Sequence, residues 1–262
     1  MQALENLTHQ EASAVQFLLT DVDDTITTEG KLRPVALEAL YRLKDAGIRT
    51  ICVTGGSAGW GDTYLRQWPV EAVLSESGAV CLYREGGAIK KYVHPSIVQE
   101  GYAQRSDALI KRVLSEVAGS KLSSDQFARI YDIAFDHGSE PPYLDKGRIE
   151  QVVNLCKSMG AGTAVSSIHI NAWFGSFGKF EGSRSFFQDV LALDESALLS
   201  RSCYCGDAPN DQVMFSRFPL SFGVGNIRFH EKSMQFLPRY AAASIGGAGF
   251  SQIVDTLLEK RC

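Results

Sequence analysis

Short apolar segments alternate with segments of helical spacing at both ends of the sequence, and this alternation limits the folds open to the chain. The apolar run at 15–20 precedes a segment at 36–43 whose apolar residues recur every three or four positions. A second apolar run follows at 48–53, and the same order of elements returns between residues 186 and 257. Such alternation predicts an α/β fold: a doubly wound parallel sheet with helices on both faces.

The middle of the sequence has a different pattern. Apolar strands at 79–83 and 88–93 flank the pair Gly86-Gly87, which predicts an antiparallel hairpin. Further helical and strand-like segments follow. We predict that residues 83–175 form a second, α+β domain inserted into a core of residues 1–82 and 176–262.

The first apolar run ends directly in three carboxylates, those of Asp21, Asp23 and Asp24. Like charges this close repel one another, and a chain tolerates them best around a cation or with one of them protonated. In a parallel α/β sheet, ligands bind beyond the carboxyl ends of the strands, where this cluster would lie. An acidic turn or a helix cap would explain the same residues, so the cluster alone leaves both interpretations open.

A second acidic cluster follows another apolar strand, at Gly206-Asp207-Ala208-Pro209-Asn210-Asp211. Two strands would then bring carboxylates to the same edge of the sheet. Mg²⁺ prefers oxygen ligands and binds one or two carboxylates together with water and phosphate. The sequence therefore predicts a magnesium site at this edge.

Two further segments have the features of a phosphate site. Thr54, Gly55 and Gly56 end a third strand, where a hydroxyl and backbone N–H groups could receive phosphoryl oxygens. Lys179 lies at the expected start of a helix, where the helix dipole disfavours a cation unless an anion is close. A glycine turn and a surface lysine are the simpler alternatives for each segment taken alone.

These four elements, in this order, resemble the four motifs of the haloacid dehalogenase superfamily. They match D-x-D-x-T at 21–25, the strand-terminal Thr54, Lys179, and G-D-x-x-N-D at 206–211, and together span almost the whole chain. The insertion between the second and third motifs resembles the α/β cap of the sugar-phosphatase branch (subfamily IIB). That branch includes sucrose-phosphate phosphatases, mannosyl-phosphoglycerate phosphatases and Cof-type hydrolases. The resemblance implies a HAD-like core with an inserted cap.

The resemblance also implies a role for each matched residue. Asp21 would be the nucleophile that forms an aspartyl-phosphate, and Asp23 the acid that protonates the leaving alcohol and then activates water. Asp21, Asp207 and the Asp23 carbonyl would bind Mg²⁺. The other residues implied to contact the phosphoryl group or to orient the site are Thr54, Gly55, Lys179, Asn210 and Asp211. Many relatives carry Arg at the position of Gly56, and often Asn at that of Ser77.

The segment Ser167–Phe174 alternates polar and apolar residues, so one face of the expected strand is polar. By analogy with the branch, this face would look onto the active site, where His169 and Asn171 could bind sugar hydroxyls. A solvated outer face is the alternative. Trp60 is either a substrate platform or a helix-packing residue, and Arg129 is a weaker candidate.

Composition and charge limit the classes of molecule that this protein is expected to bind. The formal net charge of -4 and the pI near 5.8 argue against a broad nucleic-acid surface. No segment has the length and hydropathy of a membrane span, and the start of the chain lacks the pattern of a secretory signal. The scattered cysteines fit reduced thiols. We expect a cytoplasmic monomer or homodimer that binds a small phosphorylated molecule, with no nucleic acid and no membrane.

The expected function is Mg²⁺-dependent hydrolysis of a phosphate monoester, in particular a sugar phosphate. A phosphomutase is one alternative. A non-catalytic phospho-acceptor or sugar-binding domain is another, although such a domain would not need the acid at Asp23.

Overall fold

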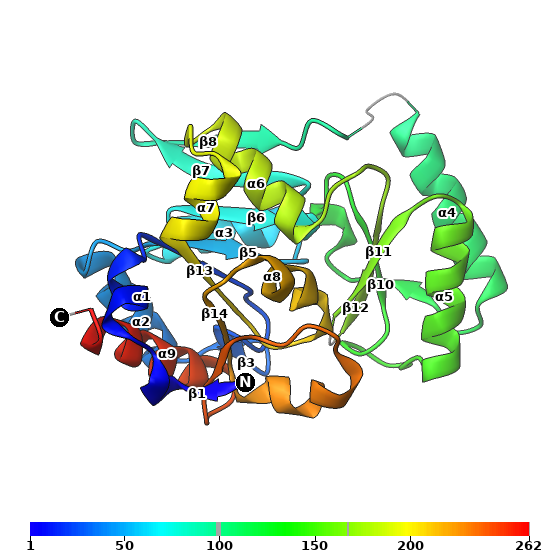
Figure 1. The fold of residues 1–262 in the computed structure, drawn as a ribbon. Helices are drawn as coiled ribbons and strands as arrows, with labels where there is room; N and C mark the ends of the chain where they lie inside the picture. Colours follow the sequence, from blue (N-terminus) through cyan, green and yellow to red (C-terminus); the bar gives the residue numbers. More distant parts are fainter. Residues whose placement is uncertain (98–100, 167, 262) are drawn as a thin grey trace.

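The computed structural model describes residues 1–97, 101–166 and 168–261 (Figure 1). Its centre is a nine-stranded sheet in the order β1-β15-β14-β13-β2-β5-β6-β7-β8. All neighbours from β1 to β6 pair in parallel, and β7 and β8 continue the sheet antiparallel. The strands are β1 (Gln2–Ala3), β2 (Phe17–Thr20), β5 (Arg49–Val53), β6 (Ala72–Ser75), β7 (Val80–Glu85), β8 (Ala88–Val93), β13 (Ser202–Gly206), β14 (Ser221–Gly223) and β15 (Tyr240–Ala241).

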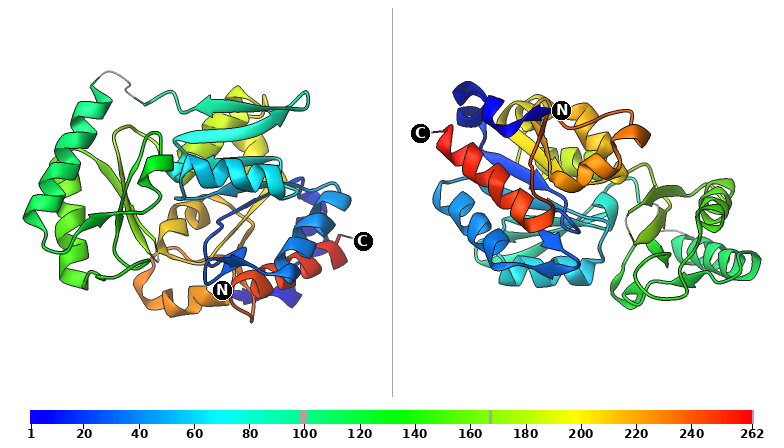
Figure 2. Two further views of the ribbon diagram at one scale, coloured as in Figure 1. Left: turned by 180° about the vertical axis from the view of Figure 1, so that it is seen from behind. Right: turned by 90° about the horizontal axis from the view of Figure 1, so that it is seen from below.

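Helices cover both faces of this sheet (Figures 1 and 2). One face packs against α1 (His9–Ala14), α2 (Pro34–Asp45), α3 (Ala58–Gln67) and α9 (Gly246–Glu259). The other face packs against α6 (Lys179–Asp189), α7 (Glu195–Arg201) and α8 (Gln212–Arg217). Successive β2 side chains alternate between the two layers, with Leu18 in the first and Phe17 and Leu19 in the second. Burial on both faces explains why the strands are apolar throughout, and the predicted α/β fold is confirmed.

A second, antiparallel sheet lies beside this core, in the order β11-β12-β10-β9 (Figure 2). Its strands are β9 (Lys121–Leu122), β10 (Ile133–Asp136), β11 (Gly162–Val165) and β12 (His169–Trp173). The helices α4 (Tyr102–Glu116) and α5 (Lys146–Ser158) share a buried apolar cluster with Ile170, Ala172 and Phe174. This part has the α+β composition expected for the insertion. We call residues 102–173 the cap.

The hairpin around Gly86-Gly87 forms as predicted, but it belongs to the large sheet. β7 pairs with β6, and Val73 lies opposite Leu82. A hairpin has the same sequence pattern whether it extends an existing sheet or begins a new one, so the sequence could not place it. The division of the chain into two domains stays a prediction, and we move its first boundary from residue 83 to beyond Val93.

A small hairpin follows the first acidic cluster. β3 (Thr27–Thr28) and β4 (Lys31–Leu32) are joined by Glu29 and Gly30, whose φ angles are +52° and +68°. Two successive positive φ angles are typical of a tight two-residue hairpin turn. Among the described residues, no helix combines the length and apolar character needed to cross a membrane.

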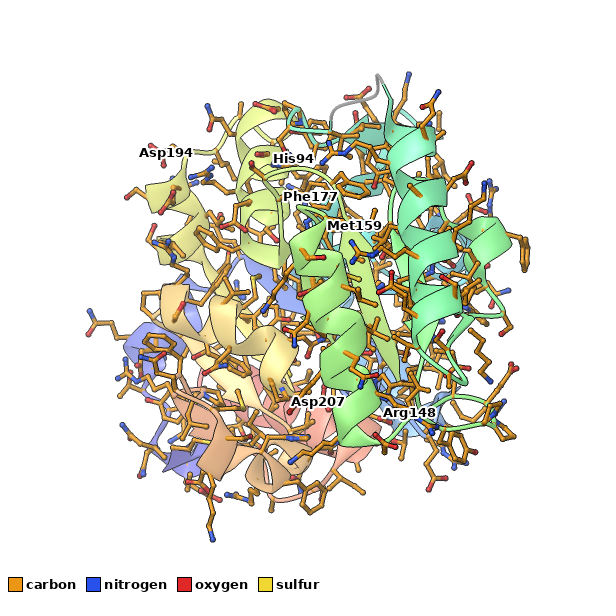
Figure 3. The ribbon with its side chains drawn as sticks, turned by 90° about the vertical axis from the view of Figure 1, so that its right-hand side faces the viewer. His94, Arg148, Met159, Phe177, Asp194 and Asp207 are labelled. Carbon is orange, nitrogen blue, oxygen red and sulfur yellow. The ribbon has the colours of Figure 1, made fainter. Side chains whose placement is uncertain are left out.

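The two chain crossings between core and cap lie side by side. His94 follows β8, Phe177 precedes α6, and their ring centres are 5.6 Å apart (Figure 3). The His94 ring nitrogens lie 2.8 Å from the Ser96 hydroxyl and 3.1 Å from that of Ser185 on α6. These contacts fix the base of the cap against the helix that begins at Lys179.

Candidate active site

Neighbouring parallel strands bring the two predicted acidic clusters together. β2 and β13 pair in register, with Thr20 opposite Cys205, and the Asp21 N–H donates to the Cys205 carbonyl over 2.9 Å. Asp21 and Asp207 therefore leave the sheet at the same edge. One carboxylate oxygen from each of Asp21, Asp207 and Asp211 lies within 4.8 Å of the other two. In Figure 3, which views the molecule from the side of the cap, Asp207 is labelled beside the lower end of α5.

The predicted lysine reaches the same cluster. Lys179 is the first residue of α6, and its Nζ lies 2.8 Å from Asp21 Oδ1 and 2.7 Å from Asp211 Oδ1. Burial by itself lowers the pKa of this ammonium, but the two adjacent carboxylates raise it further, so the lysine stays charged. A buried cation at a helix N-terminus is thus compensated by two anions.

Close backbone approaches allow this geometry. A Cβ atom on Gly182 of α6 would lie 2.6 Å from the Gly78 Cα, so the start of α6 packs directly on the loop after β6. A Cβ atom on Gly206 would lie 2.4 Å from Asp211 Oδ2. The glycine in the G-D-x-x-N-D segment is therefore needed for Asp211 to fold back onto its own loop.

Asp211 is saturated with hydrogen bonds. Its Oδ1 accepts from Lys179 and, over 2.5 Å, from the Tyr204 hydroxyl. Its Oδ2 accepts from the backbone N–H groups of Asp207 at 3.0 Å and Ala208 at 3.3 Å. This carboxylate orients Lys179 and the loop, and it has little capacity left for a metal.

Asp21 and Asp207 retain that capacity. Among the described residues, the second oxygen of Asp21 has no hydrogen-bond donor, since Lys179 donates to Oδ1. Asp207 Oδ1 accepts from the Thr25 hydroxyl at 3.1 Å, and its Oδ2 lies 3.5 Å from Asn226 Nδ2. The buried Oδ1 of Asn210 has no partner among the described residues. An all-oxygen donor set with an unused buried oxygen beside it fits a Mg²⁺ ion.

The electrostatics of the cluster also favour a cation. Burial, together with Asp211 and Asp23 and in spite of Lys179, raises the pKa of Asp21 to about 7. Burial and the charge of Asp21 raise the pKa of Asp207 well above its usual range. Burial, with Asp24 adding to it, likewise raises the pKa of Asp23. One lysine thus leaves the carboxylates under-compensated, and a divalent ion would lower these pKa values.

The third strand places Thr54 at the same edge. The buried Thr54 hydroxyl accepts from the Gly56 N–H at 2.9 Å, which closes a tight turn at the end of β5. The Gly55 carbonyl accepts from Asn171 Nδ2 at 3.0 Å and from Arg129 Nη1 at 2.9 Å. The expected phosphate loop is therefore also the surface on which the cap rests.

A buried polar network holds the cap on the core, and the sequence did not reveal it. Both Asp132 oxygens accept from Arg129, and Asp132 Oδ2 accepts from Asn171 at 2.6 Å. From the core side, the Glu76 carboxylate accepts from the backbone N–H groups of Ile130, Tyr131 and Asp132 at 2.6–3.0 Å. Asn171 thus donates its amide N–H groups to the Gly55 carbonyl and to Asp132. Its predicted contact with substrate stays a prediction.

The polar face of β12 looks toward the core, as predicted. The apolar residues of the strand pack against α4 and α5, while Asn171 contacts Gly55. His169 Nε2 lies 3.1 Å from the Ser123 hydroxyl, and burial with the nearby Arg129 lowers the pKa of the imidazole to about 4. Ser167, expected on the same face, lies outside the described residues.

Two cavities meet at this edge. A narrow one of about 20 Å³ is lined by Asp21, Asp207, Gly55 and Asn210, among others. A wider one of about 420 Å³ runs between α3, the β3–β4 hairpin and the cap. Asp23 lines both cavities. The narrow cavity adjoins Asp21 and Asp207, and the wide one leads away from them past Asp23.

The contributions of Tyr204 and Asn226 were not predicted. Tyr204 lies within the apolar run of β13, where its hydroxyl is indistinguishable from a packing residue in the sequence. Asn226 donates to the Asp24 carbonyl at 3.0 Å and accepts from the Gly246 N–H at 2.9 Å. Its position after the three-residue strand β14 carries no recognisable signal.

Comparison with known proteins identifies solved structures with a similar fold. No family model matches the sequence, and no curated protein matches it. Solved structures do match. The sucrose-phosphatase from Synechocystis sp. PCC6803, solved with sucrose and phosphate, is 16% identical, with a TM-score of 0.65 over 93% of this chain and 98% of that one.

Two other solved structures agree with that match. A haloacid dehalogenase-like hydrolase from B. subtilis is 15% identical, with a TM-score of 0.68 over 92% of this chain and 99% of that one. A phosphatase of the haloalkanoate (HAD) superfamily from Bacteroides thetaiotaomicron is 18% identical, with a TM-score of 0.64 over 94% and 95%. The chain has the fold of the haloacid dehalogenase superfamily.

Proposed function

We propose that the protein is a magnesium-dependent phosphate-monoester hydrolase that acts on a small phosphorylated metabolite, in particular a sugar phosphate. One observation carries the proposal. A buried lysine is paired with Asp21, and the other Asp21 oxygen has no hydrogen-bond donor among the described residues. Asp21 and Asp207 line a narrow cavity between the ends of three strands and the cap. Similar folds in a sucrose-phosphatase and in other phosphatases support it.

Each residue has a defined part in the proposed reaction. A carboxylate oxygen of Asp21 attacks phosphorus, the bond from phosphorus to the alcohol oxygen breaks, and Asp23 gives its proton to that oxygen. Asp23, now a carboxylate, then takes a proton from water as the water oxygen attacks the aspartyl-phosphate. This step releases phosphate and restores Asp21. Lys179 and the Thr54 loop hold the phosphoryl oxygens in position throughout.

Asp21, Asp207 and the Asp23 carbonyl would hold Mg²⁺. The bound ion would supply positive charge to the phosphoryl oxygens as negative charge develops on them. Asp211 would act through Lys179, because its own oxygens are already engaged.

Phosphate release from a panel of phosphate monoesters tests the proposal. We expect activity that is lost with EDTA and restored by Mg²⁺, and a loss of about 10³-fold or more in Asp21→Asn. Asp62→Asn is the matched control, since the Asp62 carboxylate pairs with Arg66 on the surface of α3 and lines neither cavity.

The other outcomes are equally informative. Phosphate release that is unchanged in Asp21→Asn would contradict the mechanism. Isomerisation of a sugar phosphate that depends on a bisphosphate activator would favour a phosphomutase. Phosphate release from none of the esters, with sugar binding retained, would favour a non-catalytic binding domain.

A further inference from the structure

The wide cavity is placed to receive the part of the substrate that leaves as the alcohol. It begins at Asp23, the residue that would protonate the leaving oxygen, and it shares Gly56 and His169 with the narrow cavity. Its volume of about 420 Å³ lies within the usual range for small-molecule sites, roughly 300–1,000 Å³. It could hold a group much larger than a three-carbon alcohol.

One wall of this cavity is aromatic and comes from the core. Trp60, Tyr64 and Gln67 lie on the same face of α3 and line the cavity. The Trp60 and Tyr64 rings stack with centres 5.7 Å apart, and Tyr64 stacks on Trp68 at 4.1 Å. The stack holds Trp60 in place, yet this residue remains 49% exposed. It is therefore a fixed ring with surface available to a ligand.

The opposite wall comes from the cap and is polar. Ser123 and Asp125 line it, together with His169. The cap sits directly on α3 here, since a Cβ atom on Gly59 would lie 2.7 Å from the Ala128 Cβ. A ligand between the walls would meet an aromatic surface on one side and hydroxyl, carboxylate and imidazole groups on the other.

The described lining of this cavity offers no cation to a second anionic group. Among its described lining residues, the one arginine or lysine is Arg129, whose side chain is fully buried against Asp125, Asp132 and the Gly55 carbonyl. His169 is neutral near pH 7 because burial lowers its pKa. Asp125 adds a carboxylate to the wall. A leaving group with its own phosphate would be repelled, whereas a neutral polyol would find hydrogen-bond partners.

We propose that Trp60 is a specificity-determining residue, on whose indole a neutral, hydroxyl-rich sugar ring of the leaving group stacks while the cap wall binds its hydroxyls. This inference rests on the proposed hydrolase function and narrows its substrates to esters with an uncharged sugar ring next to the phosphate. The specificity would then depend on a core helix as well as on the cap.

The test compares kcat/KM for sucrose 6-phosphate and glucose 6-phosphate with that for glycerol 3-phosphate, whose leaving group has no ring to stack on an indole. We expect Trp60→Ala to lower the ratio of sugar ester to glycerol ester about tenfold, chiefly through KM. Trp60→Phe should restore most of the ratio. Tyr41→Ala is the matched control, because Tyr41 on α2 is 48% exposed and lies outside this cavity.

A binding measurement separates this inference from the proposed function. Calorimetric titration with sucrose in the presence of inorganic phosphate needs no turnover, and Trp60→Ala should weaken sucrose binding by a similar factor. If wild type binds sucrose but hydrolyses no ester, and Trp60→Ala weakens sucrose binding, the proposed hydrolase function is wrong. The proposed role of Trp60 in sugar binding is then still supported.

Three results would overturn the inference. The first is equal loss on glycerol and sugar esters in Trp60→Ala, and the second is unchanged binding of sucrose. The third is a preference of wild type for fructose 1,6-bisphosphate, whose leaving group carries a second phosphate, over the neutral sugar esters.

Discussion

The His169 imidazole is half-buried near Arg129, and its lowered pKa keeps it neutral near pH 7 where it lines both cavities. Burial is the main cause of its lowered pKa of about 4, and the guanidinium adds to it. In the unfolded chain an imidazole has a pKa of roughly 6.5. At pH values between these two pKa values, the imidazole binds a proton in the unfolded chain but not in the folded protein.

The unfolding free energy should therefore fall as the pH decreases from about 6.5 toward 4. For this residue the expected loss is up to about 2 kcal/mol between pH 7 and pH 5. Urea unfolding of wild type and His169→Gln at both pH values measures it, with the exposed His9→Gln as a control for removing an imidazole. An identical pH dependence in wild type and His169→Gln would show that His169 is not the group responsible.

At the scale of single residues, the position of a side chain could be predicted where it begins or ends a recognisable helix or strand. Asp21, Asp207 and Thr54 end apolar strands, and Lys179 begins a helix, so the topology alone brings them to one edge. Prediction failed for Asn226 and for the Glu76 contacts with the cap, which depend on tertiary packing. Gly56 leaves room above the Thr54 hydroxyl, which a Cβ atom there would approach to 3.2 Å.

The contact between α6 and the loop after β6 is the element-scale feature on which Lys179 depends. Gly182→Ala would normally favour the helix by up to about 1 kcal/mol. Here the added Cβ would lie 2.6 Å from Gly78 Cα, a backbone atom that cannot move aside cheaply. We expect Gly182→Ala to destabilise the protein by about 1–3 kcal/mol and to reduce phosphate release, because α6 must shift.

Gly147 on α5 provides the matched control. A Cβ atom there would meet only Asp145 Oδ1, at 3.4 Å. Gly147→Ala should therefore be neutral or stabilising by up to about 1 kcal/mol in the same thermal or urea unfolding experiment. Equal effects of the two substitutions would refute the close approach of α6 to the loop.

The Glu76 carboxylate joins the loop after β6 to the cap. It is fully buried and accepts three N–H groups from 130–132 and one from Ala58. Glu76→Gln loses the charge-assisted character of these bonds, and we expect a loss of about 2 kcal/mol with faster amide exchange at 130–132. Glu71→Gln, which breaks an exposed pair with Arg49, should cost less than about 1 kcal/mol. Unchanged exchange at 130–132 would argue against Glu76 as an anchor of the cap.

Elements were predictable where hydrophobic periodicity decided them. The helix at α2 and the strands β2, β5 and β13 form close to their predicted positions. The affiliation of the β7–β8 hairpin was not predictable, because strand pairing is a non-local choice that its sequence pattern does not encode. The turn around Ser77, where φ is +57°, could not be predicted either. The residues Glu76-Ser77-Gly78 do not indicate which backbone angles they adopt.

At the scale of the whole molecule, the proposed substrate site is formed by segments that are far apart in the sequence. The wide cavity is bounded by α3, by the β3–β4 hairpin and by the cap loop at 123–129. The seating of the cap on the core, through Gly55 and Glu76, determines the shape of that cavity. No pattern within one segment could predict the cavity, whereas the acidic edge of the sheet follows from strand order alone.

The central claim is that Asp21 carries the phosphoryl group during turnover. Borohydride reduces an aspartyl-phosphate to homoserine, so quenching the enzyme with borohydride during turnover of a sugar phosphate with Mg²⁺, followed by peptide mass spectrometry, locates the residue. The account predicts homoserine at position 21 in the wild type during turnover, and none when substrate is omitted. Rapid phosphate release with an unmodified Asp21, or with the label at another residue, would contradict it.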